Sequence, residues 1–413
     1  MSGRPRADFV LAGASEVVTC SDGLASVPGG AVAALSGTIT WVGPAEDLDR
    51  EVDVLPGATR LDAGGRAVLP GLVECHTHLV WAGSRADEFE ERLAGKTYSE
   101  IAAAGGGILR TVAATRSASL EELAADARAR MERLVRQGVT TIEVKSGYGL
   151  ETETELRILE AAREAAKGQP WEVVTTFLGA HTLPREARGD EAARRRYVEQ
   201  VCEEMIPAVA ERGLARFVDV FVDAHAFRID EARAVLETGR RHGLVPKVHA
   251  DQLADDGAAR LAAEVGAVSA DHLDHASEEG LRAMAEAGTV AVLLPGADLF
   301  IGAERWADGR RMIDLGLRVA VSTDLNPGSC PSESLPLMMQ LACLRMGLRV
   351  DEAILAATRH AAEALGLADR CGSIAPGRRC DLLVLDSADR RELLYRLGSP
   401  PIHLVVAAGR IVA

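Results

Sequence analysis

The chain has 413 residues, of which 47% are hydrophobic, and its formal net charge is −15. This length allows a barrel of about 250 residues together with a smaller domain. The negative charge argues against nucleic acids and anionic membrane surfaces as partners. No apolar run approaches the ~18 residues of a membrane span. The seven cysteines are scattered without a CxxC pair, so we expect reduced thiols in a cytoplasmic protein.

The two ends of the chain share short apolar runs that are separated by glycine and proline. The N-terminal part contains DFVLAG and TITWVG, and the C-terminal part contains GSIAPGRRCDLLVLD and PIHLVVAAGRIVA. Such runs are typical of strands that are joined by turns. We therefore predict one small β domain that is formed by residues 1–66 and 376–413.

Between these ends, β-rich runs alternate with amphipathic segments such as 120–138 and 152–168. Strands that alternate with helices indicate βα units and a parallel sheet. Eight such units predict an α/β fold, a (β/α)8 TIM-like barrel, within residues 67–375. The predicted strands are AVLPGLVECHTH, TTIEVKSG, WEVVTTFLGAH, FVDVFVDA, VPKVHAD, AVSADHLDH, TVAVLLPG and RVAVSTDLN.

Side chains that are capable of chemistry follow nearly every predicted barrel strand, where the active face of such a barrel lies. The segment VECHTHLVWAG places His76 and His78 two residues apart, so both point to one face of an extended strand. A lone histidine at a strand end is more often a packing residue than a ligand. Here, however, seven of the ten histidines lie close to a predicted strand end. They are His76, His78, His181, His225, His249, His272 and His275.

Four strand-end residues suggest a metal site. His76 and His78 follow the first strand, His249 follows the fifth and Asp324 follows the eighth. Three histidines and one carboxylate suit Zn²⁺ or Fe²⁺ and leave one position open for water.

Several motifs make the chain resemble a known family. PGLVECHTH, the histidines after strands five and six, and STDLNPG resemble the amidohydrolase superfamily, whose accessory β-sandwich is similar to the two terminal segments. Within it, HTHLVWAGSRADEFEERLAGKTYSEIAAAGGGI, EVKSGYGL, TTFLGAHTLP, KVHADQ and STDLNPGS resemble the imidazolonepropionase family. The resemblance covers nearly the whole chain and implies a hydrolase of histidine degradation.

The resemblance also implies roles for individual residues. It implies one Zn or Fe ion per chain, held by His76, His78, His249 and Asp324. Binuclear relatives use a modified lysine after the fourth strand, but this strand ends in FVDAHAF, without lysine. We therefore expect a single metal ion and interpret Lys145, after the second strand, as an ion-pair or structural residue. The residues implied to contact the substrate are Arg85, Tyr98, Tyr148, His181, Gln252, Asn326, Gly328 and Ser329.

The implied substrate is 4-imidazolone-5-propanoate, and the implied product is N-formimidoyl-L-glutamate. Arg85 suits the propionate, because a guanidinium can bind a carboxylate through two parallel hydrogen bonds. A bound metal ion lowers the pKa of water towards neutrality. We expect Asp324 to accept the water proton and pass it to the leaving nitrogen, and His272 to polarise the carbonyl. Gln252 occupies a position where some relatives carry glutamate, which leaves open whether it binds the ring or also moves a proton.

Two other interpretations stay open at this point. An aminohydrolase that deaminates a heterocycle would use the same metal set, although Arg85, Tyr148 and the DLNPGS segment argue against it. A barrel that has become a binding protein would have lost its ligands, whereas all four ligands and His272 are present here. The sequence decides neither the choice between zinc and iron nor the oligomeric state. A homodimer is the expectation from the resemblance.

Overall fold

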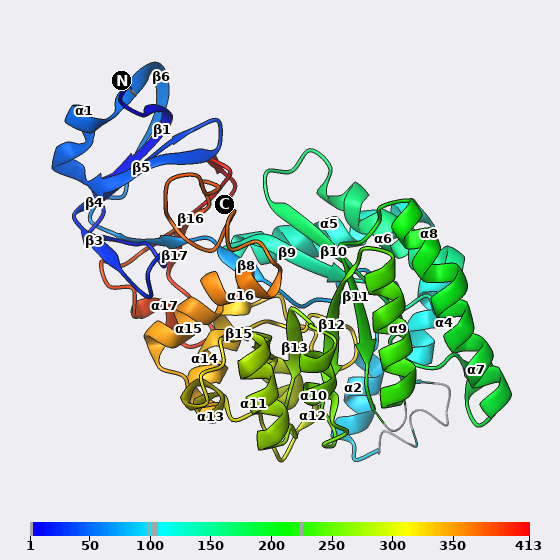
Figure 1. Cartoon of the computed structure of the whole chain (residues 1–413). Helices are drawn as coiled ribbons and strands as arrows, with labels where there is room; N and C mark the ends of the chain where they lie inside the picture. Colours follow the sequence, from blue (N-terminus) through cyan, green and yellow to red (C-terminus); the bar gives the residue numbers. More distant parts are fainter. Residues whose placement is uncertain (1–2, 97–99, 101–105, 224–225) are drawn as a thin grey trace.

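The computed structural model describes residues 3–96, 100, 106–223 and 226–413. Its centre is an eight-stranded sheet in the order β15-β14-β13-β12-β11-β10-β9-β8, and all neighbouring strands are parallel. Helices cover the outside of this sheet (Figure 1). The strands are β8 (Leu72–Glu74), β9 (Val139–Lys145), β10 (Glu172–Ala180), β11 (Phe217–Phe221), β12 (Val245–Ala250), β13 (Ser269–His272), β14 (Val290–Leu293) and β15 (Val319–Val321).

Backbone contacts between the first and last strands close the barrel. Just beyond β8 and β15, Thr77 and Leu325 form a parallel bridge. The N–H of Asp324 donates to the carbonyl of His76 at 3.1 Å, and the N–H of His78 donates to that of Leu325 at 2.9 Å. The predicted barrel is therefore confirmed, and its closure joins two of the predicted site segments.

The helix α5 (Leu120–Arg136) illustrates how the outer layer forms. The hydroxyl of Ser119 accepts a hydrogen bond from the N–H of Glu122, and the carboxylate of Glu122 accepts one from the N–H of Ser119. These two bonds provide partners for backbone N–H groups that the first turn of the helix would otherwise leave unpaired. Leu123 and Met131 are buried on the face towards the sheet. The other helices of this layer are α2 (Ala86–Leu93), α4 (Ile108–Ser117), α6 (Thr152–Ala166), η2 (Arg185–Ala187), α7 (Glu191–Gln200), η3 (Val201–Met205), α8 (Ile206–Glu211), α9 (Ile229–Arg241), α10 (Ala258–Glu264), α11 (Glu278–Ala287), α12 (Pro295–Ile301), α13 (Gly309–Asp314), α14 (Leu335–Arg345), α15 (Val350–Ala356) and α16 (Arg359–Ala364).

The two ends of the chain form a sandwich of two further sheets beside the barrel (Figure 1). One sheet has the order β5-β4-β1-β6, and the other has the order β18-β17-β16-β7-β2-β3 and combines strands from both ends. Phe9 and Val32 from the first sheet pack with Leu382 and Val406 from the second. The elements are β1 (Arg6–Ala12), β2 (Glu16–Val18), β3 (Ser26–Pro28), β4 (Gly30–Leu35), β5 (Thr38–Pro44), η1 (Ala45–Asp47), α1 (Leu48–Glu51), β6 (Asp53–Asp62), β7 (Ala67–Pro70), β16 (Leu382–Leu385), α17 (Glu392–Tyr395), β17 (Ile402–Ala407) and β18 (Arg410–Ile411).

Gly71 divides the first predicted barrel strand in two. The run AVLPGLVECHTH contains β7, which pairs with β2 and β16 in the terminal sheet, and β8, which belongs to the barrel. A Cβ at Gly71 would overlap the side chain of Thr140, so only glycine allows this close crossing between the sheets. The prediction of one strand is therefore wrong, because hydrophobic pattern does not reveal a change of sheet. The predicted boundary assigns β7 to the barrel domain, and the division into domains at residues 66 and 375 stays a prediction.

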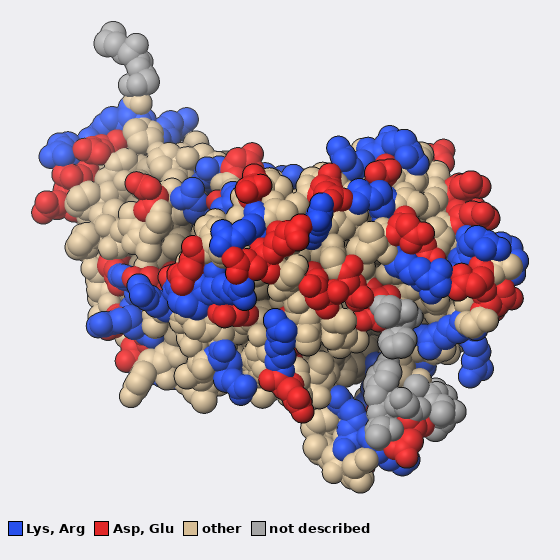
Figure 2. All heavy atoms as spheres, turned by 60° about the horizontal axis from the view of Figure 1, so that its bottom comes forward, with Lys and Arg blue, Asp and Glu red and all other residues tan. Residues whose placement is uncertain are grey.

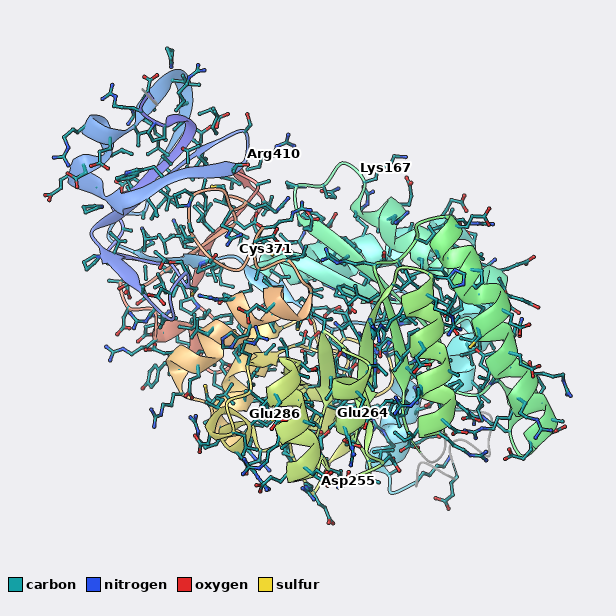
Figure 3. All side chains as sticks on the ribbon, viewed as in Figure 1. Lys167, Asp255, Glu264, Glu286, Cys371 and Arg410 are labelled. Atoms are coloured by element: carbon teal, nitrogen blue, oxygen red, sulfur yellow. The ribbon has the colours of Figure 1, made fainter. Side chains whose placement is uncertain are left out.

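The carboxyl ends of the barrel strands lie away from the point where the chain enters the barrel. Figure 3 shows Lys167, before β10, and Asp255, after β12, at opposite ends of the barrel. Because β7 leads directly into β8, the terminal sheets adjoin the end that Lys167 marks. The predicted site residues follow their strands and therefore belong to the end that Asp255 marks.

On the face in Figure 2, basic and acidic side chains are interspersed, so the described residues there form no continuous basic area. Within the described ranges, none of the helices has both the length and the apolar character that crossing a membrane requires.

Candidate functional site

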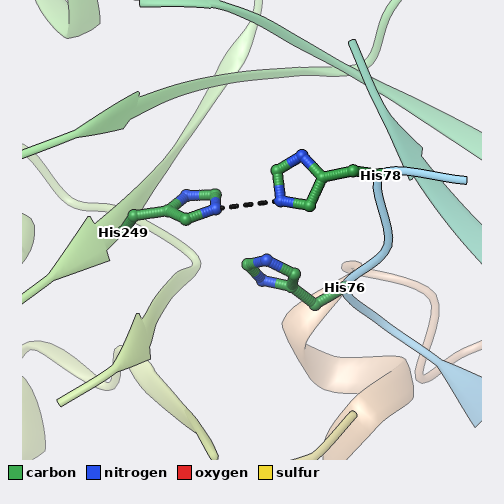
Figure 4. A group of neighbouring side chains, drawn as sticks. All are labelled: His76, His78 and His249. Atoms are coloured by element: carbon green, nitrogen blue, oxygen red, sulfur yellow. Dashed lines mark hydrogen bonds between the residues drawn. The ribbon is translucent and has the colours of Figure 1, made fainter. Parts of the chain in front are cut away.

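Three imidazoles meet at the carboxyl end of the barrel (Figure 4). His76, His78 and His249 are buried, and their candidate ligand nitrogens lie within 4.8 Å of one another. The Nε2 atoms of His78 and His249 are 3.3 Å apart. The Oδ1 atom of Asp324 lies 3.5 Å from the Nε2 atoms of both His76 and His78. The structure thus brings together the four residues that the sequence suggests as ligands.

The protonation states of these side chains suit the binding of a cation. Burial, the largest cause, lowers the pKa of His76, His78 and His249 well below the usual value, so each ring is neutral and has a lone pair to offer. The Nε2 atom of His76 is buried and has no hydrogen-bond partner in the described part of the chain, which is unusual for a buried polar atom. Burial raises the pKa of Asp324 to about 8, and a nearby cation would favour its charged form. The three histidines can therefore hold one metal ion.

In two of the histidines, a buried carboxylate lies next to the Nδ1 atom of the ring. The Nδ1 atom of His76 is hydrogen-bonded to Oδ2 of Asp271 at 2.6 Å, whereas Nδ1 of His249 lies 3.1 Å from Oδ2 of Asp219, a close contact without hydrogen-bond geometry. A carboxylate in this position keeps the proton on Nδ1 and leaves the Nε2 lone pair for a metal. The Nζ atom of Lys145 lies 2.8 Å from Asp219 and 3.5 Å from Asp271. Lys145 is therefore an ion-pair residue.

His272 lies beside the three histidines. Its ring centroid is 5.7 Å from that of His76 and 5.4 Å from that of His249. Burial lowers the pKa of His272 to about 4, so the ring is neutral and one nitrogen carries a proton. Its backbone has a φ of 78°, a left-handed conformation that is costly outside glycine and often occurs at functional sites. The ring can therefore donate a hydrogen bond to a group that is bound at the histidines.

Tyr148 and His181 form an aromatic wall next to His78. The rings of His181 and His78 are stacked at a centroid distance of 4.8 Å, and Tyr148 lies 5.4 Å from His181 and 6.0 Å from His78. Burial raises the pKa of Tyr148 and lowers that of His181 to about 4, so both side chains are neutral. Both predicted substrate contacts are thus adjacent to the histidine cluster.

A buried carboxylate shapes the loop that carries Tyr148. Glu155, in the first turn of α6, accepts the backbone N–H groups of Gly147, Gly149 and Leu150 at 2.9, 2.7 and 2.8 Å. Gly147 and Leu150 have φ values of 121° and 52°. The three hydrogen bonds therefore hold the loop in a conformation that is costly at Leu150 and that glycine allows at position 147.

Asn326 organises a turn after β15. Its Nδ2 atom donates to the carbonyl of Asp324 at 2.7 Å and to Oγ of Ser329 at 2.8 Å. Its Oδ1 atom accepts the N–H groups of Gly328 and Ser329 at 2.8 and 2.7 Å. The predicted substrate contacts Asn326, Gly328 and Ser329 thus form one unit that is attached to Asp324.

Arg85 lies against this turn. A Cβ at Gly328 would overlap Nη1 of Arg85. Glu88 accepts from Nε and Nη2 of the same guanidinium at 2.8 Å, and it also accepts the N–H of Gly107 at 3.1 Å. Glu88 therefore occupies the edge of the guanidinium formed by Nε and Nη2. The edge formed by Nη1 and Nη2 is not occupied by Glu88 and lies on the side of Gly328.

Two predicted substrate contacts are not placed in this group. Gln252 is partly exposed in the loop after β12, and no hydrogen bond or ring contact connects it to the histidines in the ranges that the structure covers. Tyr98 and His225 lie outside the described residues.

Sequence reasoning did not find Asp219, Asp271 and Glu155. A signal exists for the first two, because FVDVFVDA and AVSADHLDH each place a carboxylate inside an apolar strand. Burying a charge is costly unless it is paired, so such a residue indicates a partner. Glu155 has no such signal, since acidic residues are common in the first turn of a helix.

Comparisons with known proteins agree with this architecture. Residues 67–412 match the model of the Amidohydrolase family. The chain is 48% identical to the imidazolonepropionase of Symbiobacterium thermophilum, with 98% of this chain and 97% of that protein covered. It is also 48% identical to the imidazolonepropionase of Myxococcus xanthus, with the same coverage of 98% and 97%.

Two solved structures show the same fold at low sequence identity. An adenosine deaminase from Xanthomonas campestris with bound zinc has a TM-score of 0.76 at 19% identity, with 99% of this chain and 93% of that chain covered. An atrazine chlorohydrolase from Arthrobacter aurescens complexed with zinc has a TM-score of 0.72 at 20% identity, with 98% and 94% covered. The match to the family model and the nearly full-length identity to its members show that this chain belongs to the amidohydrolase family and, within it, to the imidazolonepropionases.

Proposed function

We propose that this chain hydrolyses the cyclic amide of 4-imidazolone-5-propanoate to N-formimidoyl-L-glutamate in histidine degradation. The similarity to imidazolonepropionases over nearly the whole chain supports this proposal. The structural observation that carries it is the meeting of three neutral imidazoles and the Asp324 carboxylate at the carboxyl end of the barrel. An amide needs such a site, because its hydrolysis requires a strong nucleophile and a stabilised oxyanion.

The proposed cofactor is one zinc or iron ion per chain, held by His76, His78, His249 and Asp324. When bound, the ion supplies Lewis-acid chemistry and lowers the pKa of water towards neutrality. Asp271 and Asp219 would keep the Nε2 atoms of two of these histidines directed at the ion.

Asp324 and His272 are the proposed catalytic residues. Oδ1 of Asp324 faces the histidines, and its Oδ2 lies 3.5 Å from the hydroxyl of Ser329. Asp324 can accept the proton of the attacking water and deliver it to the ring nitrogen that leaves. His272, as a neutral ring, can donate a hydrogen bond to the oxygen that becomes negative.

The remaining predicted residues are assigned to the substrate. The propionate would bind Arg85 at the edge of the two terminal nitrogens, because Glu88 takes the other edge. Gln252, which the structure does not connect to the cluster, would contact the ring. The other assigned contacts are Tyr98, Tyr148, His181, Asn326, Gly328 and Ser329.

The test is to measure product mass, ammonia and metal content on one sample. Opening a cyclic amide adds water and releases nothing, whereas deamination of a heterocycle expels ammonia. We expect turnover of imidazolone propionate without ammonia, and about one metal ion per chain. Ammonia from a panel of aminated heterocycles, with imidazolone propionate left intact, would replace this proposal with a deaminase.

A homodimer is proposed from the family resemblance, a cytoplasmic location from the scattered cysteines, and the lack of nucleic-acid or membrane partners from the net charge of −15. Light scattering on the purified chain tests the oligomeric state. A monomer at working concentration would contradict that part.

A further inference from the structure

A network of buried charges lies behind the histidine cluster. The side chains of Lys145 on β9, Lys247 on β12, Asp219 on β11 and Asp271 on β13 all have an exposed fraction of 0%. Charges that are removed from water in this way are retained only when they are paired. The pattern of pairing therefore shows what each lysine does.

Lys145 contacts the same oxygen atoms that support the histidines. Its Nζ atom donates to Oδ2 of Asp219 at 2.8 Å and to Oε1 of Glu143 at 2.9 Å, and it lies 3.5 Å from Oδ2 of Asp271. These two Oδ2 atoms are the ones that face Nδ1 of His249, at 3.1 Å, and Nδ1 of His76, at 2.6 Å. One ammonium group thus lies between the two carboxylates that lie against the Nδ1 atoms of two of the proposed metal ligands.

We propose that Lys145 is a positioning residue of the metal centre, which holds Asp219 and Asp271 where each one orients a metal-binding histidine. This inference rests on the proposed metal site. Without the ammonium, two like charges would be buried close together, and each carboxylate would rotate towards another donor. Mutation of a carboxylate that orients a metal-binding histidine typically lowers metal affinity about 10- to 100-fold. Because Lys145 lies between two such carboxylates, its loss should affect the orientation of both histidines.

Lys247 provides a matched control in the same network. It is equally buried, but its Nζ atom donates to the carbonyl of Cys75 at 3.0 Å and lies 3.5 Å from Oε1 of Glu143. In the described chain it has no ion-pair contact within 4.0 Å to Asp219 or Asp271, and it acts on these carboxylates only through its charge at longer range. A Lys247→Met substitution therefore removes a buried charge of the same kind without removing the contacts to the carboxylates that support the histidines.

The experiment compares zinc affinity in metal-free wild type, Lys145→Met and Lys247→Met. Affinity is measured by competition with a chromophoric chelator, and the visible spectrum of Co²⁺-loaded protein reports the geometry of the ligands. We expect Lys145→Met to weaken zinc binding about 10- to 100-fold and to alter the Co²⁺ spectrum. Lys247→Met should have a smaller effect on both. Wild-type affinity in Lys145→Met, or equal losses in the two variants, would overturn the inference.

A further variant serves if Lys145→Met does not fold. The double variant Lys145→Met with Asp219→Asn removes one positive and one negative charge, and Asp219→Asn alone is its reference. We expect the double variant to bind zinc more weakly than its reference, because Asp271 has also lost the positive charge of Lys145 beside it. Equal affinities would overturn the inference.

The outcomes separate this inference from the proposed function. A wild-type chain that neither binds zinc or iron nor opens imidazolone propionate would refute the function itself. A wild type that binds metal and turns over, beside a Lys145→Met variant with unchanged affinity, would refute only the role of Lys145.

Discussion

The guanidinium of Arg85 lies so close to the backbone of Gly328 that no side chain fits between them. This contact joins the segment after the first barrel strand to the turn after the eighth. It places the residue proposed to bind the propionate next to the turn that is attached to Asp324. The position of Arg85 thus depends on the absence of a side chain at residue 328.

Gly328→Ala should displace Arg85 and weaken substrate binding. One charge-assisted contact contributes about 1.5–3 kcal/mol, so we expect KM to rise roughly tenfold or more. Arg85→Ala is the reference and should raise KM at least as much, and Arg85→Lys should restore only part of the binding. Steady-state kinetics measure this effect, and an unchanged KM in both Ala variants would rule out the carboxylate role.

His249→Ala should lower metal content together with activity. The substitution removes one of three nitrogen ligands and leaves Asp219 without its histidine partner. Elemental analysis measures the metal, and His403→Ala, an exposed histidine on β17, is the control. Full metal retention in His249→Ala would contradict the site.

Asp324→Asn should abolish turnover even in protein that still contains metal. Asparagine keeps an oxygen that can bind a cation but cannot accept and return a proton. The measurement is product formation per metal-containing chain. Turnover close to that of the wild type would exclude Asp324 as the group that transfers the proton.

Glu155→Gln should disturb the loop that carries Tyr148. An amide has one acceptor oxygen and cannot replace a carboxylate that accepts three backbone N–H groups. Each buried donor that loses its partner costs about 1–3 kcal/mol, so thermal stability should fall and KM should rise. Glu151→Gln, a partly exposed neighbour, is the control. Equal effects of the two substitutions would show that Glu155 has no special role.

A buried pair of carboxyl groups should make stability depend on pH. Asp274, after β13, and Asp298, on α12, are buried and interact with each other. Burial, followed by the charge of Asp274, raises the pKa of Asp298 from 3.8 to about 9. The unfolded chain therefore releases this proton at a lower pH than the folded chain. The free energy of unfolding should fall as pH rises through this window, because the folded state binds more protons.

Asp298→Asn should remove this dependence, because its amide offers Asp274 a permanent N–H donor. We expect the thermal midpoint of metal-free Asp298→Asn, measured relative to that of the metal-free wild type, to be higher at about pH 8 than at about pH 5. Asp369→Asn, at an exposed position, is the control. A difference from the wild type that is the same at both pH values would show that Asp298 is not protonated in the folded chain.

Much of the site follows from local properties of the sequence. The alternation of β-rich runs and amphipathic segments predicts the eight barrel strands. The spacing of apolar residues in each segment reflects which face of the strand or helix is buried. The carboxyl ends of parallel strands meet at one end of a barrel. The positions of His76, His78, His249 and Asp324 at strand ends therefore predicted that they lie at the same end of the barrel, and the family resemblance singled them out as ligands. The spacing of Gly and Pro in both termini likewise predicts the β-rich character of the small domain.

The contacts between strands were decided only by the tertiary structure. The crossing at Gly71, the contact of Arg85 with Gly328 and the position of Lys145 between Asp219 and Asp271 each join separate elements. Such contacts depend on strand order and on the register between neighbouring strands, which no local period encodes. The sequence by itself therefore determined the residue types that the site requires. Closure of the barrel determined which of their atoms meet, because only the closed barrel brings the ends of its first and last strands together.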